Sequence, residues 1–316
     1  AASDVYKRQV AALQGSRDYR QAVQSRLIAT IADSYYTLAM LDAQLEINGR
    51  TLENWRNTVK TLEALKRVGK SNEAGVLQAK SSVMELEASH LAILKSISET
   101  ENALSSVLAM PSQTIRRGNL SDAVFSDTIA IGVPLQLLSN RPDVRNAEMN
   151  LAQAFYATNM ARAAFYPSIT LSGSLGWTNN GGGIITNPGQ WLLNAIGALT
   201  QPLFNRGTNI ANLKIAKTRQ EEARLLFQQS LLDAGKEVNY ALTAWQTAKS
   251  QIDISERQVE TLNEAVRKTQ LLMRHSDTTY LEVLTAQQTL LNAEMTLAQR
   301  RFDRIPVSYT HLTLPT

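Results

Sequence analysis

Hydrophobic residues recur every three or four positions over most of this chain, which is the spacing of one face of an α-helix. Over residues 10–68 the pattern runs without a proline, with apolar positions at Leu27, Ile31, Tyr35, Leu38, Leu41 and Leu45. Four more stretches share this character: residues 73–109, 141–166, 206–274 and 280–304. With turns at 69–72 and 275–279, the pattern predicts two long helical hairpins over residues 10–110 and 205–306. At about 1.5 Å per residue, the longest helix would span on the order of 100 Å.

A different pattern begins after Pro167, which ends the preceding helix. Small polar residues at even positions alternate with the apolar residues Ile169, Leu171, Leu175 and Trp177. This period of two predicts a strand with one apolar face and one wet face. A glycine-rich apex over residues 178–190 and a weaker alternation beyond it complete a β-hairpin over residues 167–204. Such a strand fits a transmembrane β-barrel, in which these four apolar residues would face lipid. An edge strand of a soluble α+β domain is the alternative.

The two helical hairpins are similar in sequence. When the chain is shifted by 207 residues, residues 31–95 fall on residues 238–302 without a gap, and the two interhelix turns coincide. The matched identities include Glu53 with Glu260, Val76 with Val283, Leu77 with Leu284 and Glu87 with Glu294. This ungapped register indicates a structural duplication.

Both ends of the chain resemble translated sequencing-library adapter, over residues 1–9 and 307–316. A nucleotide sequence that encodes the first peptide has a reverse complement that encodes residues 307–314 in another frame. Two unrelated termini should not be antisense partners, so we expect residues 10–306 to be the natural part of a gene fragment. By the duplication, a first strand pair is expected upstream of Val10.

Composition narrows the function classes only modestly. The chain has 316 residues, a formal net charge of +4 and no cysteine, so disulfides and cysteine-based zinc sites are excluded within it. There is no basic cluster with interleaved aromatic residues, which argues against nucleic-acid binding. No Ser/His/Asp set, paired-His metal motif or phosphate loop appears, so the sequence predicts no catalytic residue, no metal site and no cofactor. A lipidated cysteine upstream of the chain is left open.

Four segments resemble the TolC-like outer-membrane efflux proteins, in particular the NodT/OprM-like branch that pairs with resistance–nodulation–division pumps. They are GVPLQLLSNRPDV at 132–144, ARAAFYPSITLSG at 161–173, QPLFNRG at 201–207 and YLEVLTAQ at 280–287. The resemblance implies a homotrimer whose strands share one twelve-stranded barrel in the outer membrane of a Gram-negative bacterium. The long helices would form a periplasmic α-barrel, and residues 111–140 its equatorial segment. It also implies a passive export duct that works with a periplasmic adaptor and an inner-membrane transporter, without enzymatic chemistry.

The resemblance also implies functional positions. A periplasmic gate maps to Leu281, with Thr285 standing where the family often has an aspartate, and Asp277 could supply an acidic ring instead. Ordinary helix packing for Leu281 and a solvated turn for Asp277 are the alternatives. Adaptor contacts map to the two interhelix turns, at Gly69, Lys70, Ser71, Asn72, His275 and Ser276.

Two other classes of protein also contain long helices. A periplasmic adaptor would show one helical hairpin between small β domains. A soluble coiled-coil scaffold would hold a strict heptad and lack the segment from Pro167 to Phe204. The pair of hairpins and the amphipathic strand favour the export channel over both.

Overall fold

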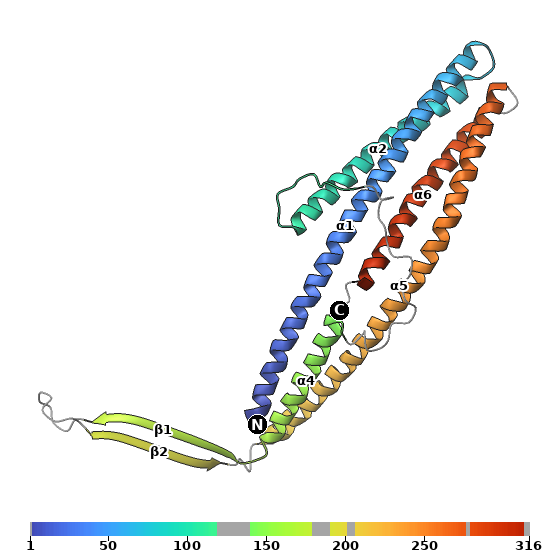
Figure 1. Ribbon diagram of the computed structural model, residues 1–316. Coiled ribbons are helices and arrows are strands. Elements are labelled where there is room, and N and C mark those ends of the chain that lie inside the picture. Colours follow the sequence, from blue (N-terminus) through green and yellow to red (C-terminus); the bar gives the residue numbers. More distant parts are fainter. Residues whose placement is uncertain (1, 119–139, 179–189, 201–205, 276–278, 313–316) are drawn as a thin grey trace, which may run out of the picture. The chain divides into compact units, whose positions relative to one another are not determined.

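A computed structural model describes residues 2–118, 140–178, 190–200, 206–275 and 279–312. Its elements are helices and one strand pair, labelled in Figure 1: α1 (Ala2–Arg67), α2 (Glu73–Val107), α4 (Pro142–Ala163), β1 (Ser168–Thr178), β2 (Gln190–Thr200), α5 (Thr208–His275) and α6 (Tyr280–Leu312). The expected mainly helical chain with one strand pair is confirmed. Within the described residues, no helix is both long and apolar enough to cross a membrane.

Most expected helix ends lie close to the observed ones, and the differences have local causes. The second helix stops at Val107 rather than 109, because Ala109 adopts φ 54° and the chain turns back through a hydrogen bond from Met110 N to Ser105 O (2.9 Å). The helix before the strand ends at Ala163, ahead of Pro167. Helices α1 and α6 run on into the segments that resemble adapter. Natural and adapter-encoded residues can both form a helix, so the interpretation of the two ends as adapter stays a prediction.

The chain divides into two compact units, which are described separately. Unit 1 comprises residues 1–21 and 141–233, and unit 2 comprises residues 22–140 and 234–316. Helices α1 and α5 contribute residues to both units. In unit 1, Gly15 lets α1 approach α4 closely: a Cβ added there would lie 3.3 Å from Met149 Cβ, and Gly15 O accepts a hydrogen bond from Asn146 Nδ2 (2.7 Å). Buried Asp18 pairs with Arg145 at 3.1 Å beside this contact.

Helix α4 begins with residues suited to a helix N-terminus. Pro142 occupies the first turn, where its missing N–H costs nothing, and Asp143 lies near the positive end of the helix dipole. Burial raises the pKa of Asp143, but the ion pair with Arg141 (2.8 Å) and the Val144 N–H outweigh it, so the pKa lies below its ordinary value. At the other end of α4, the Thr158 hydroxyl donates to Ala216 O at 3.2 Å, which joins α4 to α5.

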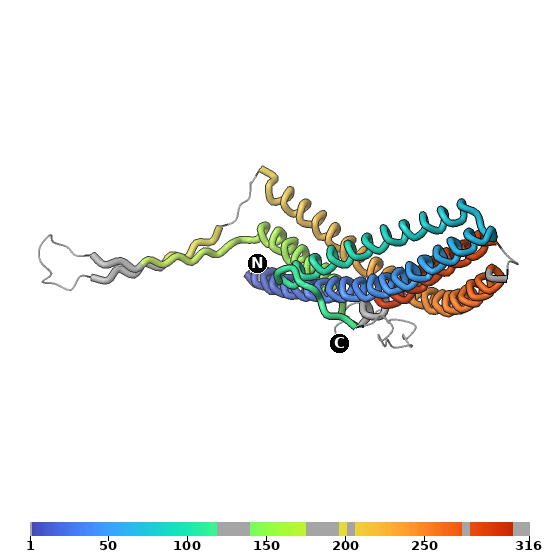
Figure 2. The backbone as a smooth tube through the Cα atoms, turned by 90° about the horizontal axis from the view of Figure 1, so that it is seen from above, coloured from blue at the N-terminus to red at the C-terminus, as the bar shows by residue number. Residues whose placement is uncertain are grey.

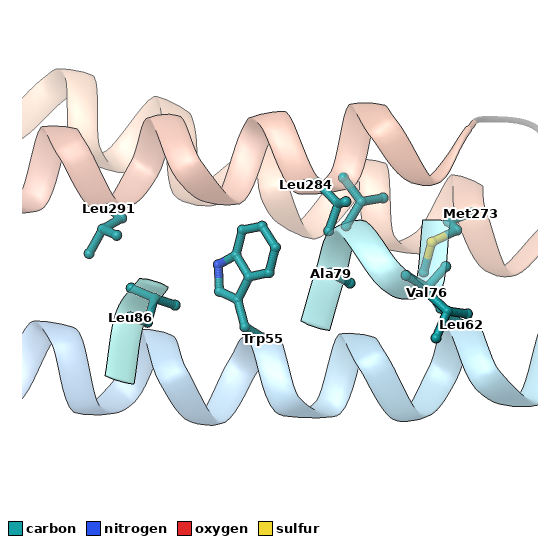
Figure 3. Close-up of a cluster of buried hydrophobic side chains, with 9 residues drawn as sticks. Trp55, Leu62, Val76, Ala79, Leu86, Met273, Leu284 and Leu291 are labelled. Atoms are coloured by element: carbon teal, nitrogen blue, oxygen red, sulfur yellow. The ribbon is translucent and has the colours of Figure 1, made fainter. Parts of the chain in front are cut away.

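Unit 2 contains α1 from residue 22 onward, all of α2, α5 from residue 234 onward, and α6. Figures 1 and 2 both show α2 beside α1 and α6 beside α5, which makes two antiparallel hairpins (Figure 1, Figure 2). A cluster of buried side chains from all four helices joins the hairpins near their interhelix turns (Figure 3): Trp55, Leu62, Val76, Ala79, Leu86, Met273, Val283, Leu284 and Leu291. A second cluster lies farther from the turns: Leu38, Met40, Leu41, Ile97 and Leu104. The first hairpin is therefore stabilised by burial along its length rather than by one compact core.

Candidate functional site: the strand pair and the hairpin ends

The strand pair has a register that sorts apolar and polar positions onto opposite faces. Strands β1 and β2 are antiparallel, with position 169 opposite 199, 171 opposite 197, 175 opposite 193 and 177 opposite 191. Residues directly opposite one another share a face of the sheet. The four apolar positions of β1 therefore share a face with Leu199, Gly197, Leu193 and Trp191. The weaker alternation of the second strand comes from Leu192 and Ile196, which fall on the other, mainly polar face.

The side chains of the strand pair that are described lie open to the surroundings. Ile169 and Leu171 are each 81% exposed, and Leu199 of β2 is 69% exposed. On the polar face, the Ser168 and Thr200 hydroxyls lie 3.0 Å apart and share a hydrogen bond. Leu175 and Trp177 lie in β1, but their side chains are outside the described part of the structure. A single chain thus leaves a large apolar strand face without cover.

The first interhelix turn is closed by backbone geometry that its sequence specifies. Gly69 adopts φ +73°, a conformation that favours glycine, and the Gly69 and Lys70 N–H groups donate to Lys66 O and Leu65 O. Asn72 then caps α2, because its side-chain oxygen accepts from Gly75 N at 2.9 Å. Lys70 is exposed, and the Ser71 hydroxyl oxygen is buried.

The second interhelix turn is described only at its edges. His275 is the last residue of α5, while Ser276 and Asp277 lie outside the described residues, so their expected roles stay predictions. Leu281, the expected gate residue, is 59% exposed in the first turn of α6. Thr285 is also exposed, and its carbonyl accepts from the Thr289 hydroxyl at 2.8 Å. Leu281 therefore does not pack in the core of its own chain.

A close contact joins the beginnings of α2 and α6. A Cβ built on buried Gly75 would lie 3.0 Å from three atoms of the Tyr280 ring, so the ring rests directly on the glycine backbone. Two polar contacts from α1 to α6 lie farther along: the amide nitrogen of buried Gln287 donates to the Thr58 hydroxyl (3.1 Å), and Arg50 pairs with Glu294 (2.7 Å). These contacts hold the start of the second hairpin's last helix against the first hairpin.

Arg117 ties the beginning of the 111–140 segment to the first hairpin. Its guanidinium donates to Asp42 on α1, with one contact at 2.8 Å, and to Glu101 on α2 at 2.6 Å. The hydrogen bond to Asp42 raises the pKa of Arg117 above its ordinary value, and burial opposes this only in part. The rest of the expected equatorial segment, residues 119–139, lies outside the described residues.

The described residues form an apolar sheet face, long helices and packed helix ends. Among the described residues, no group of three or more His, Cys, Asp or Glu side chains could hold a metal ion. A family model described as outer membrane efflux protein matches residues 133–305, more than half of the chain. The chain belongs to the outer membrane efflux protein family. Proteins of this family are channels rather than enzymes.

Curated relatives of this outer membrane efflux protein act in several kinds of export. The cation efflux system protein CusC of Escherichia coli (strain K12) is 31% identical over 92% of this chain and 64% of its own length. The pyoverdine export outer membrane protein OpmQ of Pseudomonas putida is 30% identical over 94% of this chain and 63% of its own length. The solvent efflux pump outer membrane protein SrpC of Pseudomonas putida is 28% identical over 92% of this chain. The chain spans less than two thirds of the length of these relatives.

Solved structures agree on the fold. A crystal structure of CusC matches with a TM-score of 0.89 and 28% identity, covering 98% of this chain and 74% of that chain. The outer membrane protein VceC of Vibrio cholerae matches with a TM-score of 0.88 and 25% identity, over 98% of this chain and 75% of that chain. The expected fold class is confirmed by both.

Some residues at these surfaces make contacts that the sequence alone does not predict. Gly75 has no glycine signal of its own, because its φ is unremarkable and only the Tyr280 ring across the hairpins requires it. Arg117 is one of two adjacent arginines in an irregular segment, and nothing in the sequence indicates that it meets Asp42 and Glu101. Tyr280 could have been singled out, because it opens the YLEVLTAQ segment.

Proposed function

We propose that the chain is part of an outer-membrane channel subunit, a passive duct that carries small molecules or ions from the periplasm to the exterior. The observation that carries this proposal is the register of β1 and β2, which gathers most of the apolar positions on one face of a strand pair attached to long helices. A strand pair with one apolar and one polar face suits a wall between lipid and an aqueous lumen. Family membership supports the same function and disfavours a periplasmic adaptor or a coiled-coil scaffold.

The duct is a homotrimer, and the exposed side of α2 is part of its interface. Leu77, Met84 and Leu91 form an apolar stripe along α2, at 57%, 66% and 67% exposure. Their counterparts in the duplicated hairpin, 207 residues later, are Leu284, Leu291 and Ala298, each less than 9% exposed. Leu284 and Leu291 are buried in a cluster that includes Trp55 and Leu62 of α1. The stripe of α2 therefore lacks the cover that its counterpart has within one chain.

Repetition of the same contact between copies supplies that cover. Within one chain α6 of the second repeat packs on α1 of the first repeat, so α2 of the first repeat packs on α5 of the next copy. The ion pair Arg50–Glu294 (2.7 Å) becomes Arg257 with Glu87 under the same shift. Glu87 also pairs with Arg56 of its own chain (2.7 Å), so Glu87→Arg alone disturbs both contacts. Arg257→Glu is expected to weaken the trimer, and adding Glu87→Arg to it is expected to restore the trimer in part. Native mass spectrometry measures the fraction of trimer. A double variant that dissociates as readily as the Arg257→Glu variant would contradict this interface.

The hairpin ends form the periplasmic entrance. Leu281 closes the bore, with Thr285 one turn along α6 and Asp277 in the adjoining turn. The exposure of Leu281 supports this role, because a leucine that is 59% exposed in its own chain has surface left for copies around a threefold axis. Residues Gly69–Asn72 and His275–Ser276 contact the periplasmic adaptor, and the adaptor joins the duct to an inner-membrane transporter.

The apolar strand face contacts the lipid of the outer membrane. Ile169, Leu171, Leu175 and Trp177 provide this surface from β1. The duct contributes little chemical selection, because its described residues offer no metal cluster and its relatives export substrates as unlike as cations, pyoverdine and solvents. Substrate choice therefore belongs to the inner-membrane transporter.

Membrane fractionation of the complete gene product that contains this chain tests the proposal. We expect a detergent-extractable trimer in the outer-membrane fraction, and loss of resistance to the exported compounds when the gene is deleted. A soluble monomer in the periplasm would contradict the channel and favour a scaffold protein. A strain deleted for the adaptor gene is the control for resistance, because it leaves the trimer in place and removes export.

A further inference from the structure

The seam between α1 and α2 in unit 2 follows a local heptad pattern, over residues 38–62 of α1 and 76–104 of α2. On α1 the seam positions, spaced by seven residues, are Leu38, Leu45, Leu52 and Val59, together with Leu41, Asn48, Trp55 and Leu62. On α2 they are Val76, Val83, His90, Ile97 and Leu104, together with Ala79, Leu86 and Ile93. Such a repeat of seven is the pattern by which two helices pack knobs into holes. Asn48 and His90 are the polar members of this otherwise apolar set.

The packing of the seam places these two residues opposite each other. Leu62 shares a buried cluster with Val76, and Leu41 shares the other cluster with Ile97. Because the helices are antiparallel, a step backward along α1 is matched by an equal step forward along α2. Two heptads from the pair Leu62 and Val76 therefore place Asn48 opposite His90. The ion pairs Lys80–Glu63 and Arg56–Glu87, both 2.7 Å, flank the seam. They are also one heptad apart on both helices and run in the same antiparallel sense.

Both polar residues carry buried atoms without a partner among the described residues. Asn48 is 0% exposed, and neither its Oδ1 nor its Nδ2 has a hydrogen-bond partner. His90 Nδ1 is buried and without a partner as well. An unpaired amide in an apolar interior costs several kcal/mol by transfer measurements. Three such atoms in one layer therefore point to a shared hydrogen-bonding ligand.

The duplicated hairpin shows how the same layer is satisfied elsewhere. The counterpart of Asn48 is Ser255, which is 2% exposed and accepts a hydrogen bond from Arg300. The counterpart of Arg300 in the first hairpin is Ile93, which has no group to donate. The counterpart of His90 is Leu297. The first hairpin thus keeps the polar residue at this layer but lacks the arginine that completes it.

We propose that Asn48 and His90 form one polar layer across the α1–α2 seam, bridged by a bound water molecule, and that this layer divides the seam into two separately stable blocks. A direct Asn48–His90 bond would satisfy only one of the two amide groups of Asn48. A water molecule donates and accepts, and buried waters make about three hydrogen bonds to groups of this kind. The tip block contains Trp55, Leu62 and Leu86, and the inner block contains Leu41 and Ile97. The proposal does not depend on the channel assignment.

A double-mutant cycle on the complete protein tests whether the two residues share a ligand. Asn48→Leu and His90→Leu each leave the other side chain without its partner, so each single variant is expected to lower the unfolding midpoint. The double variant removes both polar groups and joins the blocks, and is expected to raise the midpoint by about 2–4 °C. Asn54→Leu, at an exposed position of the same helix, is the control and should leave the midpoint unchanged. If the midpoint shift of the double variant equalled the sum of the two single shifts, the shared layer would be contradicted.

Hydrogen exchange and a density map give two further readouts, and both can be made on the wild-type protein. In the wild-type protein, amides of the tip block are expected to exchange together, at a rate about tenfold different from that of the inner block. In Asn48→Leu/His90→Leu the two rates should converge. One common rate along the wild-type hairpin would overturn the division into blocks. A density map of the complete protein is expected to show one water within hydrogen-bond distance of both residues, and a direct Asn48–His90 contact there would overturn the water site.

Discussion

The two helical hairpins are similar in sequence but make different contacts. The first hairpin carries ion pairs between its own helices, Lys80–Glu63 and Arg56–Glu87, and the hydrogen bond from Lys80 lowers the pKa of Glu63. In the second hairpin, α6 directs Gln287 and Glu294 toward α1 of the first. Both α2 and α6 contribute to the buried cluster, but Leu77 and Met84 of α2 are exposed where their counterparts Leu284 and Leu291 of α6 are buried. The difference teaches that two hairpins of similar sequence can bury different faces within one chain.

The largest expected effect separates the two hairpins at their buried aromatic position. Trp55 is 2% exposed in the cluster that joins all four helices, whereas its counterpart Leu262 is partly exposed. Trp55→Ala should lower the free energy of unfolding by about 3–5 kcal/mol, because it leaves a cavity among four helices. Leu262→Ala should cost less than about 2 kcal/mol. Denaturant unfolding of the complete protein measures both, and equal losses would contradict the different burial.

A smaller effect is expected where α2 meets α6. Gly75→Ala places a Cβ 3.0 Å from the Tyr280 ring and should destabilise the protein by about 1–3 kcal/mol. Gly49→Ala is the matched control, because a Cβ there meets nothing within 4 Å and removes a glycine from the middle of α1. It should stabilise the protein by about 0.4–1 kcal/mol. If the two variants changed the unfolding midpoint in the same direction, the Gly75–Tyr280 contact would be wrong.

The cap of α2 at the first turn predicts a modest effect. Asn72→Ala removes the side-chain acceptor of Gly75 N and should cost about 1 kcal/mol. Asn72→Asp keeps an acceptor at the same position and is the matched control, so it should leave the unfolding midpoint nearly unchanged. Thermal unfolding of both variants measures the difference. Equal losses for the two variants would contradict the cap.

The smallest effect is expected at the surface of the second hairpin. Arg301 and Glu256 pair at 2.8 Å with both side chains nearly half exposed. Water and salt screen such a pair, so Arg301→Ala should leave the unfolding midpoint unchanged within error. Repeating the measurement at high salt provides the control, because a midpoint that shifts with salt only in the wild type would reveal a stronger interaction than the geometry supports.

Periodicity predicted much of this fold because long helices and strands place their buried side chains at regular intervals along the sequence. The turn at Gly69–Asn72 was expected from the break between two helical patterns, and the structure adds that Gly69 closes it at a positive φ and that Asn72 caps α2. Strand β2 was harder to predict from its own sequence, because Leu192 and Ile196 interrupt the alternation of apolar and polar residues. Pairing with β1 fixes its register. Contacts between distant residues, such as Gly75 with Tyr280 or Arg117 with Asp42, depend on how helices assemble and leave no local pattern. The expected functional sites depend on neighbouring copies and partners, so a single chain does not test them.

Single-channel recording tests the proposed duct most directly. The complete protein, purified as a folded oligomer and inserted into a planar lipid bilayer, is predicted to give discrete conductance steps. Leu281→Ala is predicted to enlarge those steps, because it removes the side chain that we propose closes the entrance. Unchanged steps would remove Leu281 from the gate while leaving the duct intact. A correctly inserted, folded oligomer that conducts no current in either form would contradict the channel itself.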